Sequence, residues 1–225
     1  MTRGFALAIE SSTYVASCAL FLPGESEPAA ADEVPTRGTR GELLLPAIDA
    51  LMRREGIAPD DLTRVICGAG PGSFTSLRVG ASLAKGIARG RGIPLTAVPS
   101  LALLVQGGPA PQATGRYLAV MDAMRDERFV QEVEVGSAGS LTIHAAPRRV
   151  PASDVRALAV RLGATTIGPG DGVEVVQGPH ARGAMRLPAA LHTAVDLERW
   201  EPDYGRLAEA QVKWEAAHGR PLQRG

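Results

Sequence analysis

The sequence predicts an α/β protein built from two lobes. A strand, a polar turn and a second strand occur at residues 5–22 and again at 117–135, and a stretch rich in glycine and proline lies between them. The 225 residues, 45% of them hydrophobic, are enough for two small domains. The repeated layout, without repeated sequence, indicates a duplicated architecture.

The first lobe, residues 1–106, is predicted from short apolar runs typical of strands and from apolar residues spaced three and four apart, as in helices. Gly56 and Gly90 end the two long helical patterns, while Ser73 and Ser100 are placed to cap helices. In chain order we expect strands at 5–9 and 14–22, a helix at 41–55, a strand at 62–68, a helix at 74–89, a strand at 93–98 and a short helix at 101–106.

Residues 107–114 begin Gly-Gly-Pro-Ala-Pro and form the expected linker to the second lobe, residues 115–225. This lobe begins with two strands around a charged turn, and its middle is too rich in glycine, proline and valine to support more than short strands. The expected elements are strands at 117–121 and 129–135, short strands within 163–188, and a last helix at 203–218 that packs back on the first lobe.

The charge balance limits the kinds of partner. The chain carries 24 Lys and Arg against 24 Asp and Glu, so its formal net charge is zero. Such a protein lacks the positive field that draws whole proteins to nucleic acid or to anionic membranes. No targeting or membrane-spanning segment is visible, and the two cysteines lie in apolar runs, as in reduced proteins. We therefore expect a cytoplasmic protein with no membrane contact.

The most distinctive stretch runs from Gly68 to Arg78. Its glycines let the backbone turn sharply into a helix that begins near Phe74 with Ser73 as its cap, and the first N–H groups of that helix would point outward, where they can hold an anion. The alternative is a tight turn whose glycines only permit close packing. Neither the P-loop pattern nor the dinucleotide fingerprint is present. The candidate anion or nucleotide contacts are Gly70, Gly72, Ser73 and Thr75.

Two carboxylates, Glu10 and Asp122, each follow the first strand of a lobe. Such groups can act as general bases or bind metal, or they can simply shape the turn that contains them. The chain has no Gly-x-Ser-x-Gly nucleophile motif, and its four histidines lack metal-ligand spacing. The sequence therefore predicts no catalytic residue and no metal site.

The two long helices of the first lobe carry more apolar surface than one sheet requires. At 100° per residue, the apolar positions of the first helix cover an arc of roughly 200°, about twice a one-sided stripe. In the second helix, Gly80, Ala84 and Ala88 form a row that permits close helix approach. Both helices could be buried in a larger monomer, but broad apolar surface usually marks a partner site. The candidate partner-binding residues are Leu44, Ile48, Leu51, Met52, Val79, Leu83, Ala84 and Ile87.

Two segments resemble the signature of the TsaB (YeaZ) family, which reads GPGSFTGLRIG followed by AKGLA. Here the sequence is GPGSFTSLRVG at 70–80 and AKGIA at 84–88. Residues 8–13, 43–46 and 97–101 are similar to further family segments of the first lobe. Residues 121–127 resemble the family's DARR-x-E turn, and 202–206 its P-x-Y-x-R segment. The matching turns contain Glu10, Ser12, Thr13, Asp122, Arg125 and Glu127.

This resemblance implies two RNase H-like lobes of the actin, Hsp70 and sugar-kinase (ASKHA) superfamily. It also implies a non-catalytic subunit that binds and stabilises TsaD, which transfers threonylcarbamoyl to N6 of adenosine 37 in tRNAs reading codons that start with A. The implied partners are TsaD in a heterodimer, the ATPase TsaE, and a second copy when the chain is alone. The chain would reach tRNA only through the complex. It would hold no cofactor of its own, with ATP or ADP confined to the complex interface.

Two other functions are open. One is an enzyme of the same fold, a metallopeptidase or an ATP-using phosphotransferase, and the other is a homodimeric interaction module unrelated to tRNA. The paired histidines that hold metal in TsaD have no counterpart here, and Glu10-Ser-Ser-Thr13 replaces the superfamily's Asp-x-Gly-Thr phosphate loop. These two departures favour the non-enzymatic subunit.

Overall fold

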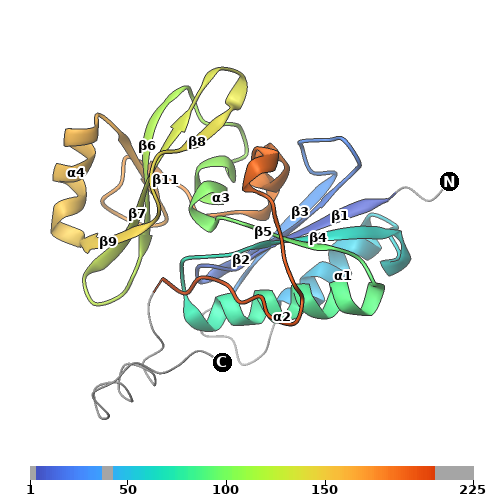
Figure 1. Ribbon diagram of the computed structural model, residues 1–225. Coiled ribbons are helices and arrows are strands. Elements are labelled where there is room, and N and C mark those ends of the chain that lie inside the picture. The colour runs from blue at the N-terminus through green and yellow to red at the C-terminus, as the bar shows by residue number, and fades with distance from the viewer. Residues whose placement is uncertain (1–3, 37–42, 206–225) are drawn as a thin grey trace, which may run out of the picture.

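The computed structural model describes residues 4–36 and 43–205, which form two β-sheets with helices packed on them (Figure 1). The first sheet has the strand order β12-β5-β4-β1-β2-β3, and the second β11-β10-β6-β7-β8, with β9 also paired to β7. This is the mixed α/β architecture that the sequence predicts. The strands of the first sheet are β1 (Phe5–Glu10), β2 (Val15–Phe21), β3 (Ala30–Pro35), β4 (Leu62–Gly68), β5 (Leu95–Val98) and β12 (Thr193–Ala194).

The central strands of the first sheet are buried on both faces over most of their length, so most of their residues are apolar. In β1, Leu7 and Ile9 point to the face covered by helices α1 (Leu44–Arg54) and α2 (Phe74–Arg91). Ala6 and Ala8 point to the other face, where the short helix α3 (Ser100–Gln106) lies. Strand β1 is antiparallel to β2 and parallel to β4, and β4 is parallel to β5.

The second sheet begins with the hairpin of β6 and β7, whose antiparallel register pairs Asp122 with Arg128. Helix α4 (Val155–Leu162) covers its outer face, where Val130 and Val150 pack against Val155 and Leu158. The strands of the second sheet are β6 (Gly115–Asp122), β7 (Glu127–Val135), β8 (Leu141–Ile143), β9 (Arg148–Pro151), β10 (Thr165–Gly168) and β11 (Val175–Val176).

Helix α3 lies between the two sheets, and each of its seven residues is buried. A single hydrophobic core surrounds this helix and takes side chains from both sheets, including Phe21 and Ile66 from the first and Tyr117 and Phe129 from the second. The two lobes are therefore joined by a shared core as well as by the chain.

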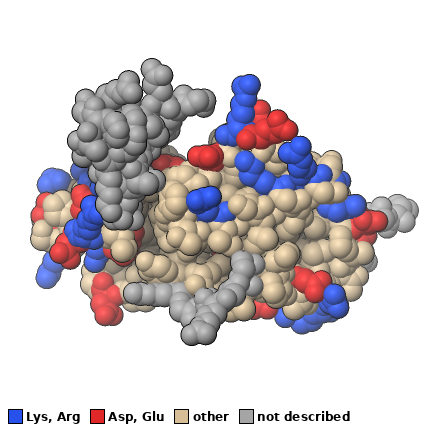
Figure 2. Space-filling model, turned by 90° about the horizontal axis from the view of Figure 1, so that it is seen from below, with Lys and Arg blue, Asp and Glu red and all other residues tan. Residues whose placement is uncertain are grey.

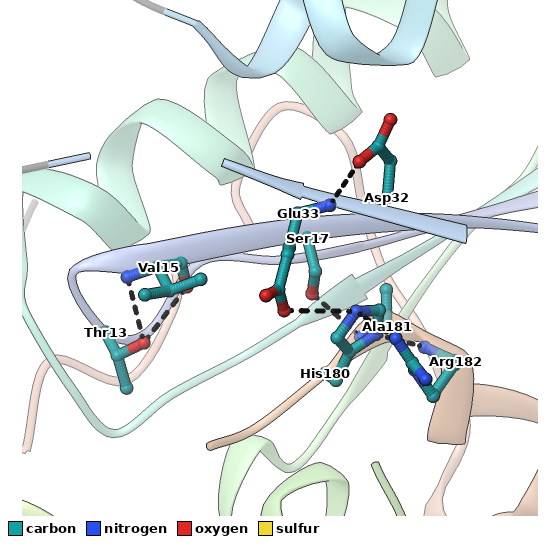
Figure 3. Close-up of polar contacts among 8 residues, drawn as sticks. All are labelled: Thr13, Val15, Ser17, Asp32, Glu33, His180, Ala181 and Arg182. Carbon is teal, nitrogen blue, oxygen red and sulfur yellow. Dashed lines mark hydrogen bonds and ion pairs between the residues drawn. The ribbon is translucent and has the colours of Figure 1, made fainter. Parts of the chain in front are cut away.

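After β11 the chain returns to the first sheet. The 3-10 helix η4 (Ala181–Arg186) packs on β1, β2 and α3, and β12 then pairs with β5. Figure 3 shows the start of η4, where the N–H of Ala181 donates to Ser17 Oγ at 2.9 Å and the ring of His180 accepts from the N–H of Arg182 at 3.0 Å. Burial, with smaller effects of Arg182 and Arg186, lowers the pKa of His180 to about 4. His180 is therefore neutral at pH 7, and its 3.6 Å contact with Glu33 is no ion pair.

Several elements differ from the sequence-based prediction. Ser100 was predicted to cap α3 but is the first residue inside it, and Pro99 takes the cap position. The Ser100 hydroxyl donates to Glu10 and caps no backbone N–H of the helix. Strand β3 lies in a segment for which no strand or helix was predicted, and it is an edge strand whose Asp32 and Glu33 obscure the strand pattern. Helix α4 is short and was not predicted. Most of the predicted helix at 203–218 lies outside the described residues. Within the described ranges, no helix has the length and apolar character needed to cross a membrane.

Replacing Leu104 in α3 by alanine should destabilise the whole chain, because its side chain is fully buried in the core that joins the sheets. We expect the free energy of unfolding to fall by about 2–5 kcal/mol, as for other buried leucines. Val160 on α4 is 77% exposed, so Val160→Ala is a matched control that should change it by less than about 0.5 kcal/mol. Urea unfolding measures both, and a Leu104→Ala loss no larger than that of the control would contradict the shared core.

Candidate functional site

A cleft of about 630 Å³ opens between the lobes, where β1 and β6 end. The turn after β1 and the start of α2 form its first-lobe wall, and the turn after β6 forms its second-lobe wall. The structure therefore brings together Ser12, Thr13 and Asp122 of the motif turns with Gly72, Ser73 and Thr75 of the glycine-rich motif. The remaining lining residues are Tyr14, Val15, Thr36, Phe74, Ser76, Met121, Ala123, Met124, Phe129 and Pro169.

Ser73 takes the cap position of α2, but its hydroxyl caps no backbone N–H, so the predicted side-chain cap is wrong. The hydroxyl instead accepts from Ser76 Oγ at 3.1 Å, and the Ser73 N–H donates to the carbonyl oxygen of Ser12 at 2.7 Å. Gly72 permits this approach, because a Cβ there would lie 2.2 Å from the same oxygen. The N–H groups of the first turn of α2 are thus left to the cleft, since no intrahelical acceptor reaches them.

Gly70 is placed differently from the other candidate anion contacts. It lies outside the cleft lining, and its N–H donates to Ser100 Oγ at 3.0 Å. Its φ of +89° favours glycine, and a Cβ would lie 2.0 Å from the carbonyl oxygen of Asp203. Gly70 therefore serves close packing against the returning chain.

Glu10 is fully buried and points away from the cleft. One carboxyl oxygen accepts from the N–H of Ser12 at 2.5 Å, and the other accepts from Ser100 Oγ at 2.8 Å. Burial raises the pKa of Glu10, and these hydrogen bonds oppose the shift only in part. A Cβ on Gly68 would lie 1.8 Å from this carboxyl group, so the site is closed on that side as well. This environment fits the turn-shaping alternative for Glu10.

The β6–β7 turn has an unusual backbone. Met124, Arg125 and Asp126 all have φ between +54° and +66°, a region that costs a non-glycine residue about 1–2 kcal/mol. Asp122 holds the turn by accepting from the N–H of Met124 at 3.1 Å and by pairing with Arg128 at 3.2 Å.

The strained turn also reaches across the cleft. The thioether of Met124 accepts from the hydroxyl of Tyr14 at 3.7 Å, which links the second lobe to the first. Glu127 at the end of the turn pairs with Arg149 on β9 at 2.7 Å, so this motif residue anchors the turn to its own sheet.

The cleft is poor in charge. Among its described lining residues Asp122 carries the only charge, and no Lys or Arg faces it. Its wall combines hydroxyl groups with a larger apolar part, which includes Phe74, Phe129 and two methionine side chains. Over the described ranges, no group of three His, Cys, Asp or Glu side chains is placed to hold a metal ion.

The second candidate site is the outer surface of α1 and α2. Most of the predicted partner-binding residues pack on the chain's own sheet, because the wide apolar arc includes the side that this sheet covers. The buried ones are Leu44, Ile48, Leu51, Met52 and Ala84, whereas Val79, Leu83 and Ile87 are half-buried. The row of Gly80, Ala84 and Ala88 also faces inward, and a Cβ on Gly80 would lie 2.1 Å from Ser11 Oγ.

The open surface, which we call the α2 face, consists of Val79 and of residues that were not predicted to bind a partner. On α2 it is a stripe of small, uncharged side chains bordered by the exposed Arg78 and Arg89, and beside α1 it includes the exposed Leu43 and Leu45. Figure 2, which views the molecule from below, shows a broad surface with few charged groups. The helix pattern contains the signal for these residues, because the exposed ones recur three and four apart. The α2 stripe consists of Thr75, Val79, Ser82, Gly86 and Gly90.

The returning chain bounds the α2 face on one side. Residues 195–205 run along α2, where Lys85 Nζ donates to the carbonyl oxygen of Trp200 at 2.9 Å and the rings of Phe74 and Tyr204 lie 4.5 Å apart. These contacts join residues more than a hundred positions apart, so sequence periodicity could not reveal them.

Comparison with known proteins places this geometry in context. The family model described as TsaD, tRNA N6-adenosine threonylcarbamoyltransferase, matches residues 36–147. A Haemophilus influenzae protein named tRNA threonylcarbamoyladenosine biosynthesis protein TsaB is 32% identical over 127 residues, 56% of this chain and 52% of that protein. The Bacillus subtilis protein of the same name is 28% identical over 229 residues, 92% of this chain and 96% of the relative.

The solved structure titled YeaZ from Pseudomonas aeruginosa has the same fold. It matches with a TM-score of 0.71 at 23% identity, over 89% of this chain and 99% of that one. The likeness agrees with the two-lobed α/β fold that the sequence resemblance implies. The matched segment spans about half the length of the Haemophilus influenzae relative and nearly all of the Bacillus subtilis one.

The raised pKa of Glu10 predicts a pH dependence of stability. The folded chain holds this proton at pH values where the unfolded chain, with a pKa near 4.5, has lost it. The resulting stabilisation is complete below pH 4.5 and is lost as the pH rises through the folded pKa. Glu10→Gln removes the titrating group, so its free energy of unfolding should improve relative to the parent as the pH rises. Urea unfolding over a pH series measures this difference, and a constant difference would show that the pKa is not raised.

Proposed function

Because the chain belongs to the TsaB (YeaZ) family, we propose that it is a non-catalytic subunit in the synthesis of N6-threonylcarbamoyladenosine at position 37 of tRNAs reading codons that start with A. It binds and stabilises a TsaD-family protein through the α2 face. The ATPase TsaE joins this pair, and a second copy occupies the same face when the chain is alone. tRNA is bound by the complex, and ATP or ADP sits at the complex interface.

The observation that carries this proposal is Gly86, in the middle of α2. A glycine inside a helix costs about 1 kcal/mol relative to alanine. Nothing in the described chain requires it, because a Cβ at Gly86 would meet no atom within 4 Å. A partner helix would account for this glycine, because a position without a side chain lets a second helix pack closely against α2. The small, uncharged residues of the stripe and the exposed Leu43 and Leu45 provide surface of the kind that interface centres bury, and the exposed Arg78 and Arg89 lie at its border.

The likeness to TsaD supports the choice of partner. The matched residues 36–147 include all of α1 and α2. A partner with this same lobe carries two equivalent helices, so the two proteins can pack helix pair against helix pair with near two-fold symmetry. The same argument accounts for pairing between two copies of this chain.

Gly86→Arg should abolish pairing while the monomer stays folded, because the added side chain has open space in the free chain but blocks a close helix. The test is capture of the purified TsaD-family protein of the same organism, with gel filtration for self-association. Ala157→Arg on the exposed side of α4 is the matched control and should bind like the parent. Gly86→Ala should raise the free energy of unfolding by up to about 1 kcal/mol. Full binding by Gly86→Arg would refute this interface.

Depletion of the protein in its own cells should lower N6-threonylcarbamoyladenosine in tRNA, measured by mass spectrometry of nucleosides. The parent chain should restore it, and Gly86→Arg should restore it less well than Ala157→Arg. Normal levels after depletion would instead favour a homodimeric module unrelated to tRNA. The enzyme alternative predicts ATP turnover or proteolysis by the purified chain alone, lost in Asp122→Ala, and we expect neither activity.

A further inference from the structure

The chain crosses between the lobes twice, first at residues 107–114 after α3 and again at 177–180 after β11. In a protein whose lobes move against each other, such crossings are the hinges. We propose that Arg186 and Gln177 lock both crossings to the end of α3, so that the lobes form one rigid unit and the cleft between them keeps a fixed width. This inference stands independently of the proposed function.

All three guanidinium nitrogens of Arg186, on η4, donate hydrogen bonds that together hold the first crossing in place. Nη1 donates to the carbonyl oxygens of Gln106 at 2.9 Å and of Gly108 at 2.7 Å, one at the end of α3 and the other in the first crossing. Nε and Nη2 form a two-pronged pair with Glu27 of the first lobe, at 2.8 and 2.5 Å. The Arg186 side chain is only 6% exposed, so its bonds to the two carbonyl oxygens are shielded from water, whereas Glu27 is 58% exposed and its carboxylate reaches solvent. The pair also lowers the pKa of Glu27, mainly through the hydrogen bond from Arg186.

Gln177 ties the second crossing to the same helix end. Its Nε2 donates to the carbonyl oxygens of Leu104 at 2.6 Å and of Val105 at 3.3 Å, and its Oε1 accepts from Gln112 Nε2 at 3.0 Å. The last carbonyl groups of a helix have no intrahelical donor. Gln177 and Arg186 together supply donors to the last three of α3, and in doing so they bind both crossings to it.

The glycines at the crossings pack so closely against neighbouring residues that no side chain would fit there. A Cβ on Gly107 would lie 2.7 Å from the backbone nitrogen of His180, and one on Gly108 would lie 2.4 Å from Gln177 Oε1. A Cβ on Gly183 would lie 2.7 Å from the carbonyl of Gln106. The Gly-Gly-Pro sequence, typical of a flexible linker, here permits close packing of two crossings against each other. The hydrophobic core that surrounds α3 also holds the two sheets together.

Distance measurements between spin labels test the lock. Cysteines at Ala58 on the first lobe and Val160 on the second are exposed and can be labelled, while the buried Cys18 and Cys67 have thiols whose pKa is raised. The parent should show one narrow distribution of distances. Arg186→Gln and, separately, Gln177→Ala should broaden it or add a second distance. Arg53→Gln is the control, because Arg53 lies on α1 and its exposed side chain pairs with Asp49 of the same helix, away from both crossings.

A folded Arg186→Gln variant with the parent's distribution would overturn the proposal, as would equal broadening in Arg53→Gln. Circular dichroism and cooperative urea unfolding establish that each variant is folded. If Arg186→Gln does not fold, Gln177→Ala decides the question alone, and an unchanged width in that variant overturns the lock.

Discussion

The burial of helix α3 is the constraint on which the rest of the structure depends. A helix that is buried on all sides needs apolar side chains around most of its circumference. The backbone N–H and C=O groups at its two ends must also find hydrogen-bond partners within the protein, because water does not reach them. At its start, Ser100 is bound to Gly70 and Glu10, and at its end the carbonyl groups are bound by Gln177 and Arg186. The first set fixes the turns that border the cleft, and the second fixes the crossings between lobes. One short helix thus sets the relation of the two sheets and the shape of the space between them.

Helix α2 shows how small residues in one element serve different neighbours. Gly80 faces inward, where Ser11 leaves no room for a side chain, so its glycine is required by the fold itself. Gly86 faces away from every described residue, so the described part of the chain gains nothing from its glycine and loses helix stability. The returning chain occupies one flank of α2 through Lys85 and Tyr204, and α1 lies toward the other. The outward stripe is what remains for another molecule.

Sequence periodicity predicted the elements with strong local patterns and failed where long-range contacts decide. Helices α1 and α2 and strands β1, β4 and β7 follow from spacing alone, because each has a clear apolar pattern. The same pattern could not separate the side that packs on the sheet from the side left open, so Leu44, Ile48 and Leu51 were expected at a partner surface although they are core. The cleft was predictable in part, since two polar turns after first strands meet there. The role of Ser100 was not, because its partner Glu10 lies ninety positions away.

This chain gives up stability at a few positions where no contact among the described residues compensates, and the proposed partner surface contains one of them. Natural sequences agree with their folds at most positions, and departures concentrate where function imposes them. Two such departures stand out in the described residues. The β6–β7 turn holds three non-glycine residues at positive φ and presents Met124 to the cleft. Helix α2 holds Gly86 at a position where alanine would fit. By contrast, Gly70 with its positive φ and the close-packed Gly107 are explained by neighbours within the chain. The two unexplained features lie on the α2 face and at the rim of the cleft. If the chain acts by binding another protein, as we propose, conformations that destabilise the free chain are expected at these surfaces.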